Sequence, residues 1–315
     1  MQKPVRPGVK TGKKRIFFEA LNPHFGYFYT VNRTLCKGVT EFQQIELVET
    51  DEFGKVLLLD NITQIGERCE YSYHEPMVHP ALSCHPKPES VLVIGGGDGG
   101  ILREVLKYRT VRRVELAELD GEVIEFSKQY LPSVHQKAFD DPRVSVNITD
   151  GREFTRKHPR EFDVIIMDMT DPFGPSKMLY SKEFFRIVRT SMRDDNGIFV
   201  MHSESPISRP STFACINRTL RSVFTHVNQM YTYIQMYGVL WSFALASPAI
   251  DTVSVRSRTI DSRLKKNGIE NLMVYNGRTH GAMQTPYPFI TSLLRKPARI
   301  ITDRNPDFPD EITSQ

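Results

Sequence analysis

The sequence predicts an α/β protein in which a small antiparallel β-domain precedes a doubly wound, mostly parallel β-sheet. The main observation is a set of five near-continuous apolar runs, which lie at 90–95, 113–119, 144–150, 162–168 and 197–203. Strands that helices cover on both faces of a sheet have this composition. Helix-like segments separate the runs, and strands that alternate with helices at this spacing indicate a parallel sheet.

The N-terminal part predicts short strands joined by tight connections. Residues with a preference for strands are concentrated at 25–31, 44–50 and 55–60. The segment from Asp51 to Gly54 supplies a turn between the last two of these strands. A helix is expected across 70–83, and the proline-containing segment 85–90 then marks a boundary.

The later segments complete this outline. Helices are predicted between the apolar runs, at 102–108, 122–131 and 181–192. Two strands near 227–234 and 241–247 predict an antiparallel edge, and helices within 250–315 are expected to pack against the sheet. We therefore divide the chain into a basic flexible tail at 1–15, a β-domain at 16–84 and an α/β domain at 85–315.

Composition and charge are typical of a soluble cytoplasmic protein. Of the 315 residues, 40% are hydrophobic and 25% are charged, which is ordinary for a globular chain. No apolar run approaches the about 20 residues of a membrane helix, and the N-terminus lacks the apolar core of a signal peptide. The four cysteines have no CxxC spacing, so neither a zinc site nor a disulfide framework is expected. The tail has no aromatic residue to stack on bases, which favours a solvated terminus over a nucleic-acid or lipid contact.

A glycine-rich loop follows the first buried strand of the α/β part. It consists of five glycines and Asp98 at 95–100, and it opens the predicted helix that includes 102–108. Such a loop lets the backbone approach a ligand closely, and it fits both dinucleotide sites and S-adenosylmethionine-type sites. A dinucleotide would place its phosphates at the helix N-terminus, where Asp98 would repel them. The loop therefore favours a nucleoside that carries a positive charge.

Acidic residues stand at the ends of successive predicted strands. These acids are Glu118, Asp150, Asp168 and Asp171, in addition to Asp98 of the glycine-rich loop. Ligands bind at the carboxyl ends of the strands in open α/β sheets, so these acids are expected to face one crevice. Acids after strands can also cap helices, and this interpretation is preferred for Asp163 and Asp194. An acidic crevice on a chain with a net charge of +4 predicts a cationic substrate.

These segments together resemble the spermidine synthases, which are polyamine aminopropyltransferases. The resemblance rests on VLVIGGGDGGILREVLKY at 91–108, AELD at 117–120, TDG at 149–151 and MDMTDPFGP at 167–175. FGKVLLLDNITQIGERCEYSYHEPMVHPAL at 53–82 and VYNGRTHGAM at 274–283 extend it, so that it runs from about residue 16 to about residue 290. It implies a methyltransferase-like Rossmann catalytic domain with a seven-stranded sheet, and assembly as a homodimer or homotetramer.

The resemblance also implies roles for individual residues. The thioadenosine part of decarboxylated S-adenosylmethionine would be held by Gln43, Glu118, Asp150, Gly151 and Pro175. The aminopropyl ammonium of this donor would bind Asp98. The acceptor amine would be faced by Tyr73, His74, Asp98, Asp168 and Asp171, with Asp168 as the proton acceptor. The loop at 169–180 would act as a lid. The donor is a co-substrate, and no permanently bound cofactor and no metal ion are implied.

The chain departs from the family pattern at three places. Cys69 stands where the family usually has aspartate, and Asn61 stands where it usually has glycine. The loop at 235–241, which lines the amine pocket in the family, is one residue shorter between its tyrosine and its tryptophan. The acceptor therefore stays open among putrescine, which is the family default, agmatine, cadaverine and longer polyamines.

The reaction explains why acids are needed. An alkylamine with a pKa of about 10.4 must lose a proton before it attacks, which costs about 4–5 kcal/mol near pH 7. Asp168 is the candidate that accepts this proton. The far ammonium of a diamine requires a second acid, either Asp171 or Glu204, although Glu204 can equally be a solvated loop acid. His74 and His79 have HExxxH spacing around Pro76, which argues against a zinc helix.

Two other functions remain as alternatives. An S-adenosylmethionine-dependent methyltransferase could use the same fold, but its donor carries a carboxylate that Asp98 would repel. A non-catalytic ligand-binding protein on this fold would not need both Asp168 and Asp171. A dehydrogenase is a more distant third alternative.

Overall fold

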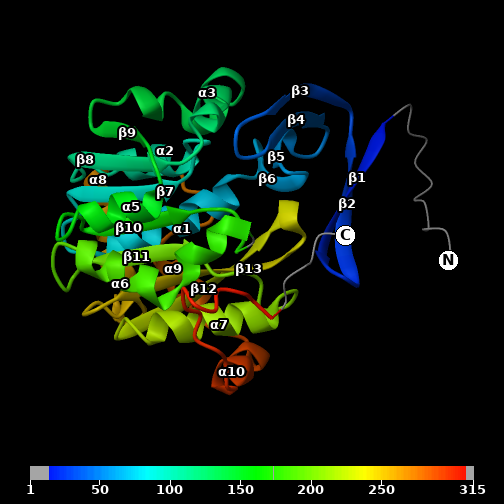
Figure 1. Ribbon diagram of the computed structural model, residues 1–315. Coiled ribbons are helices and arrows are strands. Elements are labelled where there is room, and N and C mark those ends of the chain that lie inside the picture. The colour runs from blue at the N-terminus through cyan, green and yellow to red at the C-terminus, as the bar shows by residue number, and fades with distance from the viewer. Residues whose placement is uncertain (1–13, 173, 310–315) are drawn as a thin grey trace.

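A computed structural model describes residues 14–172 and 174–309 of the chain (Figure 1). Its strands form a two-stranded ribbon, a four-stranded antiparallel sheet and a seven-stranded sheet. The predicted basic tail lies outside the described residues except for Lys14 and Arg15. The described part of the chain contains no helix that is both long enough and apolar enough to cross a bilayer.

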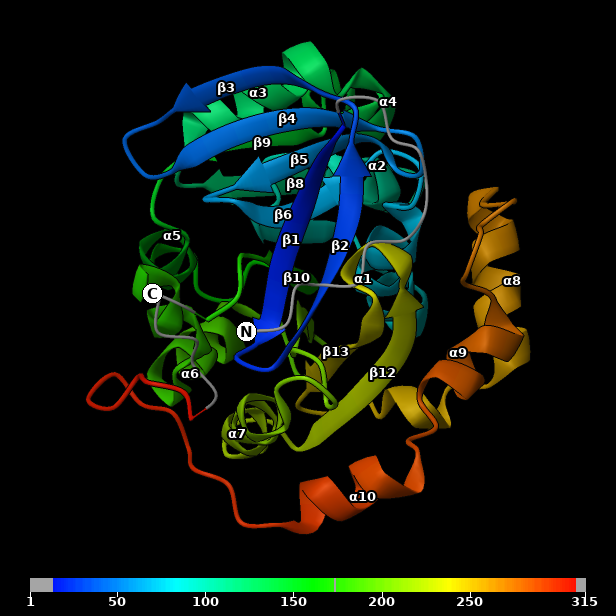
Figure 2. The same ribbon diagram turned by 90° about the vertical axis from the view of Figure 1, so that its right-hand side faces the viewer.

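The N-terminal part is entirely antiparallel, as predicted. The ribbon pairs β1 (Arg15–Asn22) with β2 (Phe25–Val31). The four-stranded sheet contains β3 (Arg33–Val39), β4 (Gln44–Thr50), β5 (Gly54–Leu59) and β6 (Ile62–Gly66). The predicted strands correspond to β2, β4 and β5, whereas β1, β3 and β6 were not predicted. Figure 2 shows the ribbon lying across the front of the molecule, with one end directed toward α7 (Pro210–Arg221).

The turn between β5 and β6 explains one departure from the family pattern. Asp60 and Asn61 have φ angles of 49° and 60°, so both occupy the left-handed region. Asparagine tolerates this conformation better than most residues other than glycine, because its short polar side chain can hydrogen-bond locally. Asn61 therefore preserves a tight hairpin at this position.

The seven-stranded sheet has the order β12-β13-β11-β10-β7-β8-β9. Its strands are β7 (Ser90–Gly95), β8 (Arg113–Glu118), β9 (Val144–Ile148), β10 (Val164–Asp168), β11 (Ile198–His202), β12 (His226–Ile234) and β13 (Val239–Ser247). The pairings from β11 through β9 are parallel, whereas β13 is antiparallel to both β11 and β12. The predicted parallel sheet with an antiparallel edge is confirmed.

Helices cover both faces of this sheet. They are α1 (Tyr71–Cys84), α2 (Gly100–Leu106), α3 (Gly121–Tyr130), α4 (Pro132–His135), α5 (Gly151–Lys157), α6 (Lys182–Ser191), α7, α8 (Ser257–Asn267), α9 (Gly277–Met283) and α10 (Pro288–Arg295). Along β7, Val91 and Val93 join one buried cluster, while Leu92 and Ile94 join the other. This alternation follows from the two-residue period of a strand. The first cluster includes residues of α1, α2 and α8, and the second includes residues of α6 and α7.

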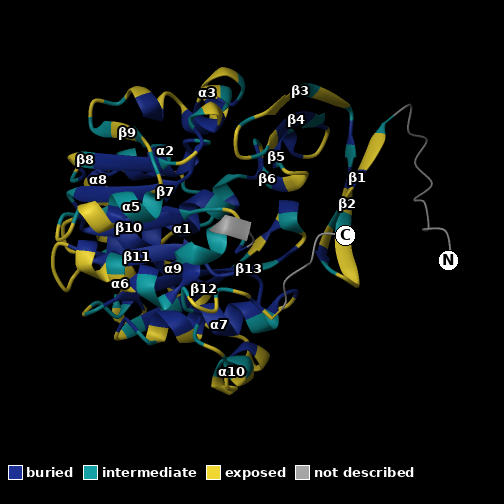
Figure 3. Cartoon of the chain, in the orientation of Figure 1, coloured by how far each residue is buried: buried dark blue, intermediate teal, exposed yellow. Residues whose placement is uncertain are grey.

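Burial distinguishes the central sheet from its periphery. Figure 3 shows the middle strands of this sheet as almost wholly buried, whereas the β1–β2 ribbon and α10 carry many exposed positions. Helix α1 is buried along nearly its whole length and contacts both α2 and β11. It thus packs with the α/β part of the chain, although it precedes residue 85. The division at 84/85 stays a prediction, and we propose a boundary just before α1.

Candidate functional site

The glycine-rich loop joins β7 to α2 and brings distant side chains together. Gly96 has a φ of 78°, a left-handed conformation that glycine adopts without strain. A Cβ atom at Gly100 would lie only 2.1 Å from Cε1 of His74, so glycine is needed for this close approach to helix α1. The loop thereby places Asp98 next to His74 and next to the carboxyl end of β10.

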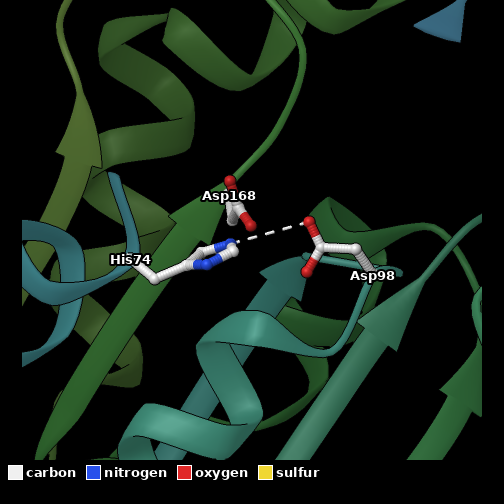
Figure 4. Close-up of side chains that lie close together, drawn as sticks. All are labelled: His74, Asp98 and Asp168. Atoms are coloured by element: carbon white, nitrogen blue, oxygen red, sulfur yellow. Dashed lines mark ion pairs between the residues drawn. The ribbon is translucent and has the colours of Figure 1, made fainter. Parts of the chain in front are cut away.

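His74, Asp98 and Asp168 form what we call the central cluster, in which the three side chains face one another (Figure 4). His74 Nε2 lies 3.6 Å from Asp98 Oδ2. The nearest nitrogen and oxygen atoms of all three side chains lie within 4.8 Å of one another. The residues come from α1, from the glycine-rich loop and from the end of β10. The structure thus brings together two of the acids that were expected at this edge of the sheet.

Acidic neighbours on two sides keep His74 protonated. Glu70 Oε2 lies 2.5 Å from His74 Nδ1, and Asp98 faces the other ring nitrogen. Burial favours the neutral imidazole, but Asp98 and Glu70 outweigh it and raise the pKa of His74 to about 10. Burial likewise opposes the charge of Asp98, yet His74 holds the pKa of Asp98 below its usual value. At neutral pH the central cluster therefore contains an imidazolium and an ionised Asp98.

Asp168 is suited to accept a proton. The Tyr73 hydroxyl donates a hydrogen bond of 2.9 Å to Asp168 Oδ1. Burial and the negative charge of Asp98 raise the pKa of Asp168 to about 6. A carboxylate with this pKa is mostly ionised at pH 7 but binds a proton more readily than an ordinary aspartate does. The arrangement supports a general base at the end of β10.

Glu118 ends β8, the strand next to β7. Burial raises the pKa of Glu118 to about 7. Its Oε1 accepts a hydrogen bond of 3.0 Å from the backbone N–H of Asp120. Gln43, which lies between β3 and β4, donates a hydrogen bond of 3.0 Å to Asp120 Oδ2. Two residues predicted to bind the donor, one from each part of the chain, are therefore connected through Asp120.

The other residues assigned to the donor lie at the start of α5 and in the following loop. Asp150 is exposed, and its Oδ1 accepts a hydrogen bond of 2.8 Å from the backbone N–H of Glu153, which makes Asp150 the N-cap of α5. A Cβ at Gly151 would lie 2.4 Å from Cγ2 of Ile94, so glycine lets α5 begin against β7. The side chain of Pro175 lies outside the described residues. The roles of these three residues stay predictions.

Two acids that were interpreted as helix caps have other partners, so that prediction is wrong. Asp163 Oδ2 accepts hydrogen bonds of 2.8 and 2.9 Å from the backbone N–H groups of Glu89 and Ser90. It therefore pairs two backbone N–H groups at the start of β7, a central strand of the sheet. Asp194 Oδ1 accepts a hydrogen bond of 2.7 Å from the backbone N–H of Asn196 and closes the turn before β11.

Asp171, Glu204 and Arg209 form a second group, which we call the distal cluster. Arg209 Nη1 lies 3.2 Å from Asp171 Oδ2 and 3.5 Å from Glu204 Oε1. The side chain of Glu204 is only 1% exposed, so the interpretation of Glu204 as a solvated loop acid is wrong. Burial and the charge of Asp171 raise the pKa of Glu204 well above its usual value. Asp171 faces the distal cluster and Asp150 caps a helix, and the expectation that all five acids line one crevice stays a prediction.

Aromatic side chains lie between the two clusters. The ring of Tyr73 lies 6.4 Å from that of Tyr237 and 5.3 Å from that of Phe243, measured between ring centroids. Tyr237 in turn lies 5.2 Å from Trp241. Burial raises the pKa of Tyr237, and the charges of Asp171 and Asp168 act in the same direction. The shorter loop of this chain thus supplies rings next to both groups of acids, which suits the methylene groups of an alkylamine.

Comparison with known proteins identifies the family. The family model described as the spermine/spermidine synthase domain matches residues 70–256, and the one described as the spermidine synthase tetramerisation domain matches residues 16–67. The chain belongs to the spermine/spermidine synthase family. The resemblance seen in the sequence motifs is thereby confirmed.

Curated members of the spermine/spermidine synthase family are similar to most of this chain. The polyamine aminopropyltransferase of Nitrosomonas europaea is 40% identical over 287 residues, which cover 91% of this chain and 88% of the relative. The polyamine aminopropyltransferase of Bacillus subtilis is 40% identical over 252 residues, which cover 79% and 90% of the two chains. These relatives support an aminopropyltransferase activity.

Solved structures of spermidine synthases confirm the predicted fold class. The crystal structure from Thermotoga maritima matches with a TM-score of 0.83 and 33% identity, covering 92% of this chain and 97% of that one. A crystal structure of spermidine synthase in complex with the transition state analogue AdoDATO matches with the same TM-score and identity, covering 93% and 98%.

Sequence analysis missed two charged residues of this spermine/spermidine synthase site. Glu70 lies four positions before His74, a helical spacing that places both side chains on one face and could have revealed the pair. Arg209 has no comparable local signal. Its relation to Asp171 and Glu204 depends on how β10, β11 and α7 meet in space.

Two groups of three side chains contain atoms of the kinds that bind metal ions. These groups are His74, Asp98 and Asp168, and Asp171, His202 and Glu204. In the first group His74 Nδ1 already lies 2.5 Å from Glu70 Oε2, and His74 Nε2 lies 3.6 Å from Asp98 Oδ2. In the second the guanidinium of Arg209 already lies beside both acids.

A separate hollow of about 590 Å³ lies between the end of α1 and α8. Arg258, Arg263 and Lys266 contribute to its lining, and none of its described lining residues is acidic. It shares no residue with the central or the distal cluster. Because none of its described lining residues is acidic, the volume of this hollow alone does not make it the candidate site for cationic substrates.

Proposed function

We propose that this chain transfers the aminopropyl group of decarboxylated S-adenosylmethionine to putrescine or a related diamine, and releases methylthioadenosine. The observation that carries the proposal is the position of Asp168 between acids on neighbouring strands. Asp98 and Glu118 belong to the β7 and β8 side, whereas Asp171 and Glu204 belong to the β11 side. The first pair suits a cationic nucleoside and the second suits an amine.

The donor occupies the side of the glycine-rich loop. Asp98 holds the donor ammonium, and the thioadenosine part contacts Gln43, Glu118, Asp150, Gly151 and Pro175. His74 acts by keeping Asp98 ionised and oriented, since their facing atoms are 3.6 Å apart. Intact S-adenosylmethionine carries a carboxylate next to its amine, and this group would be repelled by the ionised Asp98. The site therefore selects the decarboxylated donor.

The transfer is a direct displacement. The lone pair of a neutral amine nitrogen forms a bond to the propyl carbon attached to sulfur. The carbon–sulfur bond breaks, its electron pair returns to sulfur, and the sulfonium becomes the neutral thioether of methylthioadenosine. The surplus proton of the new secondary ammonium passes to Asp168. Charge is balanced because the positive charge lost by sulfur appears as this proton.

Residues on the acceptor side align the amine and remove its proton. Tyr73 fixes Asp168 through the hydrogen bond to Oδ1, which leaves Oδ2 facing Gly96 and available to a ligand. Asp171 and the distal cluster bind the far ammonium of the diamine. Holding nitrogen, carbon and sulfur in line removes the entropic cost of their encounter, which is a large part of such barriers.

The family also supports a proposal on assembly and location. The match to a tetramerisation domain over residues 16–67 supports oligomerisation, and we propose a homodimer or homotetramer. The protein would act in the cytoplasm on small molecules, without a permanently bound cofactor.

The test is an incubation of the purified chain with a mixture of amines and either the decarboxylated or the intact donor. We expect methylthioadenosine and an amine that is heavier by one aminopropyl group, from the decarboxylated donor only. Release of S-adenosylhomocysteine from the intact donor would instead identify a methyltransferase. Absence of turnover with every amine, together with measurable binding of the nucleoside, would indicate a non-catalytic ligand-binding protein.

A further inference from the structure

Arg209 is a buried cation at the place where an amine substrate would present its own positive charge. The residue is 6% exposed and precedes α7. Besides the contacts of Nη1 with Asp171 and Glu204, its Nε donates a hydrogen bond of 3.3 Å to the carbonyl oxygen of Leu21 in β1. An arginine keeps its charge at every physiological pH. The positive charge is therefore a permanent part of the distal cluster.

The strand order places this charge at the far end of the acceptor side. Going along the edge of the sheet, Glu118 ends β8, Asp98 follows β7, Asp168 ends β10 and Glu204 follows β11. Neighbouring strands are about 5 Å apart, so each step moves the position away from the donor by about that distance. An acceptor that extends from Asp168 away from the donor therefore reaches Asp171 and Glu204, and Arg209 lies beside both of these acids.

The surroundings of Glu204 fix its backbone and leave one of its carboxylate oxygens for a ligand. It has a φ of 70°, which is unfavourable for a residue with a side chain. The Ser242 hydroxyl donates a hydrogen bond of 2.5 Å to its carbonyl oxygen, which helps to fix this backbone. Its Oε2 is buried and has no hydrogen-bond partner among the described residues. A buried acceptor atom without a partner is costly unless a ligand satisfies it, and an ammonium group is such a ligand.

We propose that Arg209 is a specificity-determining residue that restricts the acceptor to diamines and disfavours triamines. This inference rests on the proposed function. One ammonium can share Asp171 with the guanidinium and can donate to Glu204. The additional positive charge of a triamine would have to lie beside Arg209. A further acid, Glu19, interacts with Asp171, but burial raises the pKa of Glu19 and so disfavours the negative charge that could neutralise this addition. Burial and the charge of Asp171 raise the pKa of Glu204, which limits the negative charge that the distal cluster can offer.

The test compares kcat/KM for a diamine, for a triamine, and for a diamine that carries an uncharged alkyl chain as long as the triamine. The variants are Arg209→Gln, which removes the charge, and Arg209→Lys, which keeps it. Arg218→Gln is the matched control, since it makes the same change at an exposed position of α7, the helix that Arg209 precedes.

We expect the unmodified protein to prefer the diamine over the triamine by about tenfold or more, since like charges at close range are strongly disfavoured. R209Q should reduce this preference by about tenfold, whereas R209K and R218Q should keep it. An unchanged preference in an R209Q protein that still uses the diamine would overturn the inference. Equal use of diamine and triamine by the unmodified protein would overturn it as well.

The uncharged long amine separates charge from length and does not depend on the folding of any variant. If Arg209 acts through its charge, the unmodified protein uses this amine better than the triamine. If both are used equally poorly, length is the limit and the inference is wrong. Absence of turnover with every amine would count against the proposed function itself, so the two failures are distinguishable.

Discussion

The central and distal clusters each contain a buried cation between acids, but they hold this charge differently. His74 lies between Asp98 and Glu70, and its charge depends on these acids because an isolated imidazole is mostly neutral at pH 7. Arg209 lies between Asp171 and Glu204, and its charge does not depend on its neighbours. In the central cluster the acids keep His74 positively charged. In the distal cluster the permanent charge of Arg209 limits which cations the acids can bind.

This difference suggests a division of labour. The central cluster is a coupled system in which a change at Asp98 alters both His74 and Asp168, as expected where protons are moved. The distal cluster is fixed in charge and is suited to selecting a substrate. The following predictions test that distinction, beginning with the largest effect.

Removing the base should have the greatest effect. Asp168→Asn preserves the size of the side chain and the contact with Tyr73 but cannot accept the proton, so kcat/KM should fall by about 10²- to 10⁴-fold. Methylthioadenosine release measures the rate. Asp194→Asn, which changes an exposed turn, is the control and should retain full activity. Activity of D168N within a few-fold of the unmodified protein would exclude Asp168 as the base.

Changing Asp98 should act on the donor. Asp98→Ala removes the acid that faces the donor ammonium, and a charge-assisted hydrogen bond of this kind contributes about 1.5–3 kcal/mol. Calorimetry should therefore show binding of decarboxylated S-adenosylmethionine weakened by about 10- to 100-fold. Affinity for methylthioadenosine, which lacks the ammonium, should change much less. Equal losses for both nucleosides would contradict a specific role at the ammonium.

The pH profile should report the coupling within the central cluster. Because the pKa of Asp168 is raised to about 6, kcat should fall as the pH is lowered through about 6 and the base becomes protonated. Asp98→Asn removes the negative charge that contributes to this shift, so the acidic limb should move to lower pH. Measurement of kcat between pH 5 and 8 would show it, and an unmoved limb would argue that the two carboxyl groups are not coupled.

A change at Glu204 should have the smallest effect on activity. Glu204→Gln keeps the size of the side chain and an oxygen that can accept a hydrogen bond, while burial and the charge of Asp171 already oppose a full negative charge at this position. We expect KM for the diamine to rise by about threefold, as for the loss of one modest hydrogen bond, with donor affinity unchanged. A shift of the acidic limb in E204Q would show that the distal cluster also takes part in proton transfer, and the proposed distinction would fail.

Local sequence patterns predicted the parts of the fold with strong periodicity or special chemistry. The apolar runs of β7, β10 and β11 were found because strands buried on both faces are apolar throughout. The ribbon strand β1 was missed because its apolar residues do not alternate with polar ones: Phe17 and Phe18 are adjacent, yet Phe17 is buried and Phe18 is 65% exposed. Its pairing depends on contacts that the local sequence does not show.

The candidate site was likewise predictable only in part. Asp98 and Asp168 were found because glycine-rich loops and strand ends have characteristic positions in α/β sheets. Arg209 lies 38 positions after Asp171 and reaches it only because α7 begins near the ends of β10 and β11. The second interpretation of Asp150, as a helix cap, also required the structure, because strand-end acids serve both purposes.

The most direct test of the placement of both substrates is a crystal structure of the protein with methylthioadenosine and a diamine. We predict the ribose on Glu118, one amine nitrogen beside Asp168 and the other between Asp171 and Glu204. An amine bound on the β8 side of Asp168, or acids at positions 98, 168 and 171 that face different regions, would contradict the account.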